Sequence, residues 1–386
     1  MMRALLVAAL MMVAQSAAAI EPVRVGLIAT LSGPSAPLGR HLRDGFMLGL
    51  KQSGGLLGGR PLKLAVHDDA RDVAALTSQA PTLMKTEKPQ VVIGPLFNPL
   101  LGPVLKAATE AKAIVISPRA APAALAGKRC QSNFFSLAPQ DDEAIEALAK
   151  FAEERNLTRA IIVSTVGEEA DIAATAFTRA FKGEVADRIQ IAPDATDFTD
   201  MSNRIDVLRP QAVFLHVGGA IAGPLLKFLS ESGATSGMVL LGSAGFDEAD
   251  LSSPDGTLMG VYSASDWAYD LKNPANEAFL QAFQSEYGYA PGAVAMRGYD
   301  AARLLDAAYG ALTKDPVGMA ELAEAIRQAS IDSPRGKFNF GNNNFPIEDI
   351  YLTRIEPDAS GQPRNAVQKQ IFAQYGDHYA SECPLK

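Results

Sequence analysis

Residues 23–52 read VRVGLIATLSGPSAPLGRHLRDGFMLGLKQ, and this stretch decides the fold class. Val23 to Ile28 is a short apolar run typical of a buried strand, and Gly39 to Gln52 has the apolar period of an amphipathic helix. A strand that is followed by a covering helix is the repeating unit of a parallel sheet. The stretch therefore predicts an α/β protein.

The same alternation continues along the chain and predicts two doubly wound units in succession. In the first unit we expect strands at 62–67, 91–93 and 114–116 and helices at 72–84 and 100–111. In the second we expect helices at 141–154, 170–181, 198–208 and 221–232, and strands at 160–163, 185–191, 212–216 and 239–241. After Trp267 come three helices, at 276–287, 294–312 and 319–328, and a late strand at 350–355.

A chain of 386 residues is too long for one hydrophobic core, because single cores stop growing at roughly 250 to 300 residues. The late helices and strand suggest that the chain returns to its first unit after completing the second. A chain that returns in this way forms two lobes joined by a hinge of three segments. We expect these segments near 136–140, 261–266 and 338–347. We expect residues 20–137 with 266–340 in lobe 1, and residues 138–265 with 341–386 in lobe 2.

The N-terminus has the pattern of a secretory signal peptide over residues 1–19. Met1-Met2-Arg3 is a basic start, the apolar run from Ala4 to Val13 follows, and Ala17-x-Ala19 is a small-residue cleavage site. The run is shorter than the roughly 20 residues that span a bilayer. We therefore expect a mature start at Ile20 and a protein free in the periplasm, with an anchoring amphipathic helix as the alternative.

The charge balance argues against nucleic acid as a partner. The 35 Lys and Arg residues face 43 Asp and Glu residues, which gives a net charge of −8, and phosphate would be repelled by such a surface.

The two cysteines, Cys130 and Cys383, are predicted to form a disulfide, because export places them in an oxidising compartment. Two buried free thiols are the alternative. The 4 histidines are scattered without metal-ligand spacing, so we expect no metal site.

Most catalytic motifs are missing. The Gly-rich segment 54–59 follows a helix and precedes a strand, which is the wrong order for a dinucleotide fingerprint, and 242–245 lacks the spacing of a nucleophile elbow. His67-Asp68-Asp69 at a strand end could be a ligand cluster or an acid and base pair, but it has no third partner in register, so we expect a solvated strand end. We therefore expect no enzyme activity and no cofactor.

Three loops remain at the predicted carboxyl ends of strands, where open α/β sheets bind ligands. They are 30–34, which contains Ser32, 94–99 and 117–122. In the second loop Asn98 can cap the next helix and Pro99 can take its first position, which would leave N–H groups for an anion. Plain turn chemistry is the alternative for each loop.

In order and spacing, these residues resemble the periplasmic solute-binding proteins of ABC importers, of the type that binds leucine, isoleucine and valine. The resemblance covers nearly the whole mature chain. It is carried by VRVG at 23–26, LSGP at 31–34, Gly39, RDG at 43–45, GG at 54–55, DD at 68–69, VIGP at 92–95, ISP at 116–118 and GYDAA at 298–302. A late Cys paired with one that follows the last helix of the first lobe also resembles part of this family.

The resemblance implies a clamshell of two lobes that closes on a small solute and delivers it to an inner-membrane ABC permease, without catalysis. We expect a monomer. A ligand-sensing protein of the same fold, without a transport role, is an alternative.

The binding positions of the family carry over to Asn98 beside Phe97, to Arg119 and Ala121, and in the second lobe to Glu169, Ala220 and Ala244. The usual aromatic and acidic residues of the second lobe are absent, so the solute ammonium has no expected partner unless Glu168, Glu169 or Asp247 substitutes. Phe97 and Phe246, with Trp267, could line an apolar pocket, or could belong to the lobe cores.

These substitutions lead to a specific hypothesis about the solute. It carries a carboxylate or other anionic group, held by Asn98 and Arg119, and an apolar or aromatic body. Arg119 could instead extend to solvent from the cleft rim. Binding of a branched-chain or other amino acid through a substituted ammonium site is the alternative.

Overall fold

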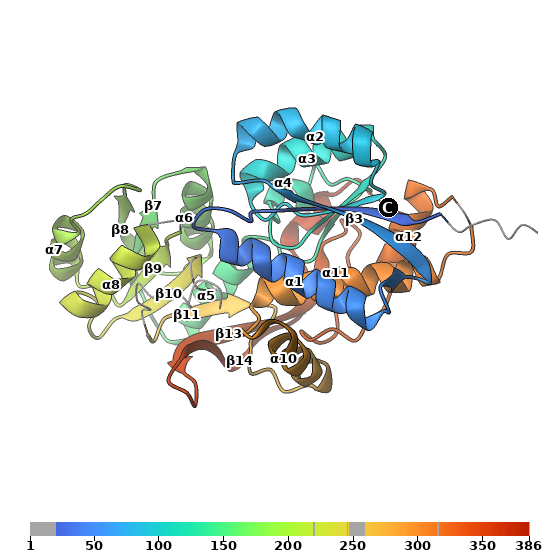
Figure 1. Ribbon diagram of the computed structural model, residues 1–386. Helices are drawn as coiled ribbons and strands as arrows, with labels where there is room; N and C mark the ends of the chain where they lie inside the picture. Colours follow the sequence, from blue (N-terminus) through green and yellow to red (C-terminus); the bar gives the residue numbers. More distant parts are fainter. Residues whose placement is uncertain (1–20, 219–220, 245, 247–258, 315, 386) are drawn as a thin grey trace, which may run out of the picture.

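A computed structural model describes residues 21–218, 221–244, 246, 259–314 and 316–385 (Figure 1). The chain forms two α/β lobes, each built on its own sheet. It passes between the lobes after β6 (Phe134–Ser136), after β11 (Tyr262–Ser265) and at the start of β13 (Pro346–Pro357), so three segments join the lobes, as predicted. The short strand β12 (Asn339–Phe340) pairs with β13, but its Phe340 packs against the core of the first lobe. The predicted signal peptide, residues 1–19, lies outside the described residues.

The first lobe is built on a sheet of six strands in the order β2-β3-β1-β4-β5-β6. All pairs are parallel except β2 with β3. The carboxyl ends of β1, β4 and β5 therefore lie at one edge, where the strand order reverses. The bounds are β1 (Val23–Ala29), β2 (Leu56–Leu57), β3 (Arg60–Asp68), β4 (Val91–Ile93), β5 (Ile114–Ser117) and β6 (Phe134–Ser136).

Helices cover both faces of this sheet, with α2 and α3 on one side and α1 and α11 on the other (Figure 1). The backbones of α1 and α11 touch, because a Cβ at Gly45 would lie 1.9 Å from the carbonyl oxygen of Ala295. The bounds are α1 (Ala36–Gln52), α2 (Val73–Glu87), α3 (Asn98–Glu110), α4 (Ala123–Ala126), α10 (Pro274–Tyr287), α11 (Ala293–Gly310) and α12 (Met319–Gln328).

The second lobe is built on a sheet of eight strands, in the order β12-β13-β11-β10-β9-β7-β8, with β14 paired to β13. The strands from β8 to β11 are parallel, and β13 is antiparallel to both β11 and β14. The bounds are β7 (Arg159–Thr165), β8 (Glu184–Ile191), β9 (Ala212–His216), β10 (Val239–Ala244), β11 (Tyr262–Ser265), β12 (Asn339–Phe340), β13 (Pro346–Pro357) and β14 (Pro363–Tyr375).

Alternate residues of the central strands pack into two different cores. Ile161 and Val163 of β7 join a cluster with α7 and α8, whereas Ala160 and Ile162 join a cluster with α5 and α6. This is the two-residue period of a strand that is covered on both faces. The bounds of these helices are α5 (Glu143–Glu154), α6 (Glu168–Ala180), α7 (Thr199–Leu208) and α8 (Ala222–Ser232).

The long strand β14 was not predicted from the sequence. It lies at the edge of the sheet, and of its 13 residues only Asn365 and Ile371 are buried. An exposed edge strand of this kind lacks the apolar alternation that marks a strand.

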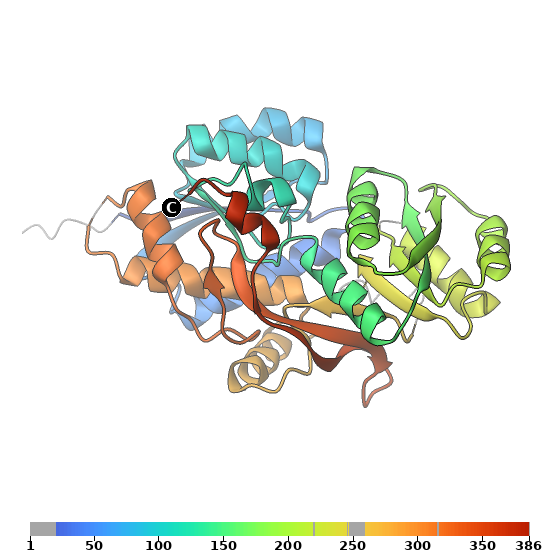
Figure 2. The same cartoon turned by 180° about the vertical axis from the view of Figure 1, so that it is seen from behind.

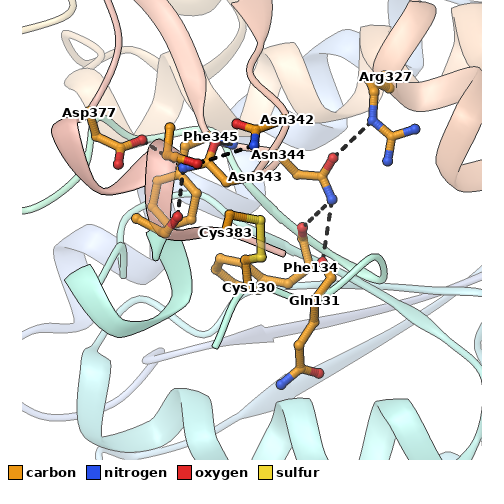
Figure 3. The surroundings of a disulfide bond; sticks show 12 residues. Cys130, Gln131, Phe134, Arg327, Asn342, Asn343, Asn344, Phe345, Asp377 and Cys383 are labelled. Carbon is orange, nitrogen blue, oxygen red and sulfur yellow. Dashed lines mark hydrogen bonds between the residues drawn. A yellow bond between two sulfur atoms is a disulfide. The ribbon is translucent and has the colours of Figure 1, made fainter. Parts of the chain in front are cut away.

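The end of the chain returns to the first lobe. Cys130 and Cys383 form the predicted disulfide, and the short helix η2 (His378–Glu382) lies beside α4 (Figures 2 and 3). Nearby, the Asn343 amide donates to Ala126 O and to an Asp377 carboxylate oxygen, both at 2.8 Å. The placement of residues 378–383 therefore differs from the expected assignment of 341–386 to the second lobe, because the disulfide and these bonds hold the tail on the first lobe.

Candidate functional site

A cleft of about 1950 Å³ lies between the two lobes and is lined by residues of both. Its walls come from the loops that follow β1, β4 and β5 in the first lobe, and from the loops that follow β7 and β9 together with Ser243 of β10 in the second. Carboxyl ends of parallel strands from both lobes thus face one space, which is where open α/β sheets bind ligands.

An aromatic ring and two cations form the first-lobe wall. The guanidinium carbon of Arg71 lies 3.9 Å from the centre of the Phe97 ring, and that of Arg119 lies 4.9 Å from it. Arg119 is half-buried, and its Nη1 donates to Leu96 O at 3.3 Å. All three side chains line the cleft. Arg119 is thus held against the cleft wall by the ring and by the backbone.

Asn98 does not cap α3. The N-cap is Phe97, and Asn98 is the first helical residue, with its Nδ2 donating to a carboxylate oxygen of Asp141 at 2.7 Å. Its Oδ1 is buried with no hydrogen-bond partner among the described residues. The amide nitrogen of Asn98 therefore already has an acceptor within the protein, the Asp141 carboxylate.

Asp141 is a functional candidate that the sequence did not reveal. It lines the cleft between Asn98 and the start of α5, and burial raises its pKa to about 6, although the Asn98 amide and the positive charge of Arg119 oppose that shift. The negative charge of Glu169 raises it further. In this part of the cleft Arg119 therefore lies near two carboxyl groups, those of Asp141 and Glu169.

His216 is the second candidate that was missed. It is the last residue of β9, and its Nδ1 lies 2.9 Å from the Ser243 Oγ of β10. Burial lowers its pKa to about 4, and the positive charge of Arg119 lowers it further, so the imidazole is neutral at pH 7. The only signal in the sequence was its place at the end of a predicted strand.

The other predicted residues lie in different places. Glu169 lines the cleft, whereas Ser32 lies exposed in the loop after β1 and Ala121 is fully buried, both outside the cleft lining. Ala220 and Asp247 lie outside the described residues. Ala244 ends β10, but its side chain lies outside the described part of the chain.

Two aromatic residues belong to cores rather than to the cleft. Phe246 is buried in the hydrophobic core of the second lobe, and a Cβ at Gly242 would lie 2.3 Å from its ring. Trp267 is 1% exposed and donates from Nε1 to Asn276 Oδ1 at 2.8 Å. Of the predicted aromatic lining, the structure therefore brings only Phe97 to the cleft.

Three side chains of the types that bind metals lie close together, but they pair with a cation of the protein itself. Ligand atoms of Asp142, Glu146 and His378 lie within 4.8 Å of one another. Arg179 Nη2, however, lies 2.8 Å from Asp142 and 3.1 Å from Glu146. The cluster is an ion-pair network that joins α5, α6 and η2.

The chain belongs to the periplasmic binding protein family, whose model matches residues 22–362. It is 25% identical over 391 residues to "Leu/Ile/Val-binding protein homolog 6" of Brucella abortus, and the match covers 97% of each chain. Among solved structures it is similar to an ABC-transporter solute-binding protein of R. palustris in complex with benzoate, with 28% identity, a TM-score of 0.83 and coverage of 95% of this chain and 100% of the other.

A third similarity is to a branched-chain amino acid transporter substrate-binding protein of Streptococcus pneumoniae in complex with isoleucine. Its identity is 20% and its TM-score 0.78, over 91% of this chain and 100% of the other, so this likeness supports the fold alone. Both the fold and the family thus define a solute-binding protein of the ABC-transporter type. Among the described residues, no helix has the length and apolar character needed to cross a membrane.

Proposed function

We propose that this chain is the extracytoplasmic solute-binding component of an ABC importer, and that its solute is a small carboxylate with an aromatic or apolar body. The observation that carries the proposal is Arg119 held beside the Phe97 ring on the cleft wall. A guanidinium can bind a carboxylate through two parallel hydrogen bonds, and the ring offers an apolar surface next to it. The 28% identical relative that binds benzoate supports the same solute class.

The second lobe supplies a different kind of contact. The neutral His216 and Ser243 can exchange hydrogen bonds with a polar group of the solute without adding charge. A solute that touches Arg119 on one lobe and His216 on the other would favour the closed state, because it binds that state better than the open one.

An amino acid is the second candidate, and Asp141 with Glu169 favours it. Both carboxyl groups lie in the cleft with Arg119, which is the charge pattern that a zwitterion needs. In that case the solute ammonium would meet Asp141, and its carboxylate would meet Arg119.

A thermal-shift screen of residues 20–386 tests both candidates. The panel contains benzoate, hydroxybenzoates and aliphatic carboxylates on one side, and leucine, isoleucine and valine on the other. A ligand at 100 times its Kd adds about 2.7 kcal/mol, which raises the Tm by a few degrees. Stabilisation by the amine-free carboxylates alone supports the first candidate, and stabilisation by the amino acids alone supports the second. Silence across the panel contradicts both and favours a bulkier solute.

The remaining features of the proposal concern the cell. Residues 1–19 are removed on export, and the mature chain, without catalytic activity or a membrane anchor, works as a monomer in the periplasm and passes its solute to an inner-membrane permease. N-terminal sequencing of the periplasmic fraction and light scattering of the purified protein test these points. A neighbouring permease and ATPase gene pair would separate transport from ligand sensing.

A further inference from the structure

The three segments that join the lobes meet at one buried guanidinium group. Arg335 Nη1 donates to Leu137 O at 2.6 Å, to Asp266 Oδ2 at 2.9 Å and to Glu348 Oε2 at 2.8 Å. Leu137 follows β6, Asp266 follows β11 and Glu348 lies on β13, so each joining segment contributes one acceptor. The Arg335 side chain is 1% exposed, and its Nε also donates to Asp300 of α11 at 3.1 Å.

A second arginine connects this point to the cleft. Arg297 of α11 donates from Nε to Asp266 Oδ2 at 3.0 Å, and its Nη2 pairs with the other carboxylate oxygen. Its Nη1 lies 3.4 Å from Pro118 O, and the side chain lines the cleft. Pro118 directly precedes Arg119. Arg297 thus contacts both the carboxylate of Asp266 in the hinge and the loop that carries Arg119, the proposed anion-binding residue.

The same loop has another link to the hinge. Leu137 N donates to Ser117 O at 2.7 Å, while Leu137 O accepts from Arg335. Two sets of hydrogen bonds therefore link the loop 117–122 to the joining segments. One runs from Ser117 through the Leu137 backbone to Arg335, and the other runs from Pro118 through Arg297 to Asp266.

We propose that Arg297 is a positioning residue for lobe closure, which holds the solute loop 117–122 and the hinge at Asp266 as one rigid unit. Hinges work by changes of backbone dihedrals in a few residues, so the rigidity of their surroundings decides how far and how uniformly the lobes move. Asp266 is fully buried, and without Arg297 it would keep only one of its two guanidinium partners.

The proposal is independent of the identity of the solute, so the test uses the mature protein without any ligand. Spin labels at Lys106→Cys and Ile172→Cys, which are exposed on opposite walls of the cleft, report the distance between the lobes. Hydrogen exchange of the segments 117–122 and 263–268 reports their local opening.

In Arg297→Met we expect a broader distribution of inter-lobe distances and exchange about tenfold or more faster in both segments, the size of effect that follows from loss of a charged hydrogen bond. Asp266→Asn weakens the same link from its other end together with the pair that Asp266 makes with Arg335, so it should have at least as large an effect. Adding Arg297→Met to Asp266→Asn should then change little further.

Arg303→Met is the matched control, since Arg303 lies on the same helix but bonds to Tyr299 rather than to the hinge. It should leave both readouts unchanged. Arg297→Lys keeps the charge and should restore part of the wild-type distance distribution, which also covers the case in which Arg297→Met does not fold. Wild-type distances and exchange in Arg297→Met and in Asp266→Asn would overturn the proposal, as would an equal effect of Arg303→Met. If Arg297→Met does not fold, wild-type distances and exchange in Asp266→Asn overturn it alone.

Discussion

At the scale of single residues, Arg119 carries the proposed recognition of the solute. Arg119→Ala should weaken binding of a carboxylate solute by about 1.5 to 3 kcal/mol, because a charged hydrogen bond is lost while the Phe97 ring remains. Titration calorimetry with the stabilising solute measures the change. Arg209→Ala is the control, because Arg209 ends α7 with its side chain 81% exposed. Equal affinities of Arg119→Ala and the wild type would remove the anion contact.

The buried His216 leads to a prediction of how the stability of the protein depends on pH. Its folded pKa of about 4 lies below its ordinary value of 6.5, mainly because the imidazole is buried. The unfolded chain takes up this proton first, so the contribution of His216 to stability is present above pH 6.5 and is lost as the pH falls towards 4. His216→Gln should therefore lose less stability than the wild type between pH 7 and pH 5, as measured by urea unfolding. Parallel curves for the two proteins would contradict this assignment.

At the scale of elements, the contact between α1 and α11 depends on glycine. In an open helix Gly→Ala is stabilising by about 1 kcal/mol, but a Cβ at Gly45 would lie 1.9 Å from Ala295 O. We expect Gly45→Ala to lower the free energy of unfolding by more than about 2 kcal/mol, because the two helices must separate. The control is Gly102→Ala on α3, where nothing lies within 4 Å and a small gain is expected. Thermal unfolding of both variants checks the difference in sign.

The disulfide is the second feature at this scale. It closes a sequence separation of 253 residues, and its removal by Cys130→Ser with Cys383→Ser should cost about 2 to 5 kcal/mol. Without the disulfide, the C-terminal residues 376–383, which include η2, would be held on the first lobe only by packing and hydrogen bonds. Limited proteolysis should cleave near residues 376–383 sooner in the double variant, while the wild type under reducing conditions should behave like the variant. Resistance equal to that of the oxidised wild type would show that the disulfide does not hold the tail.

At the scale of the whole molecule, the hinge contains more buried acids than bases. Burial raises the pKa of Glu348 to about 8, and the negative charge of Asp266 adds to the shift, while Arg335 and Arg297 oppose it. Glu143 interacts with Glu348 as well: burial and the negative charge of Glu348 both raise the pKa of Glu143. A raised carboxyl pKa means that stability is fully present below about pH 4.5 and declines as the pH rises through 8.

Glu348→Gln should consequently reduce the loss of Tm between pH 5 and pH 8, because a neutral amide replaces the carboxyl group that must ionise. Differential scanning calorimetry over this range measures the slope. Gln368→Glu on the exposed part of β14 serves as a control for a charge change outside the hinge, because its side chain bonds only to Ala366 O of the same strand among the described residues. A slope that is as steep in Glu348→Gln as in the wild type would place the titrating group elsewhere.

The sequence by itself determined the elements and their order. Apolar periods are local, so strands such as 91–93 and 212–216 and the helix 319–328 were predicted with the bounds that the structure has, and the order of the elements indicated two lobes and three crossings. The disulfide followed from the compartment. Strands without local alternation, such as the exposed β14, escaped this kind of analysis.

Only the tertiary structure decided which polar groups share the cleft and the hinge. Asp141 joins Asn98 across 43 positions, His216 joins Ser243 across 27, and Arg335 joins Leu137 across 198. None of these contacts leaves a local pattern, because each depends on how separate strands end at one edge or cross between lobes. For the same reason Phe246 and Trp267 could not be assigned to core or cleft before the fold was known: an aromatic side chain suits either place, and only its neighbours in space decide.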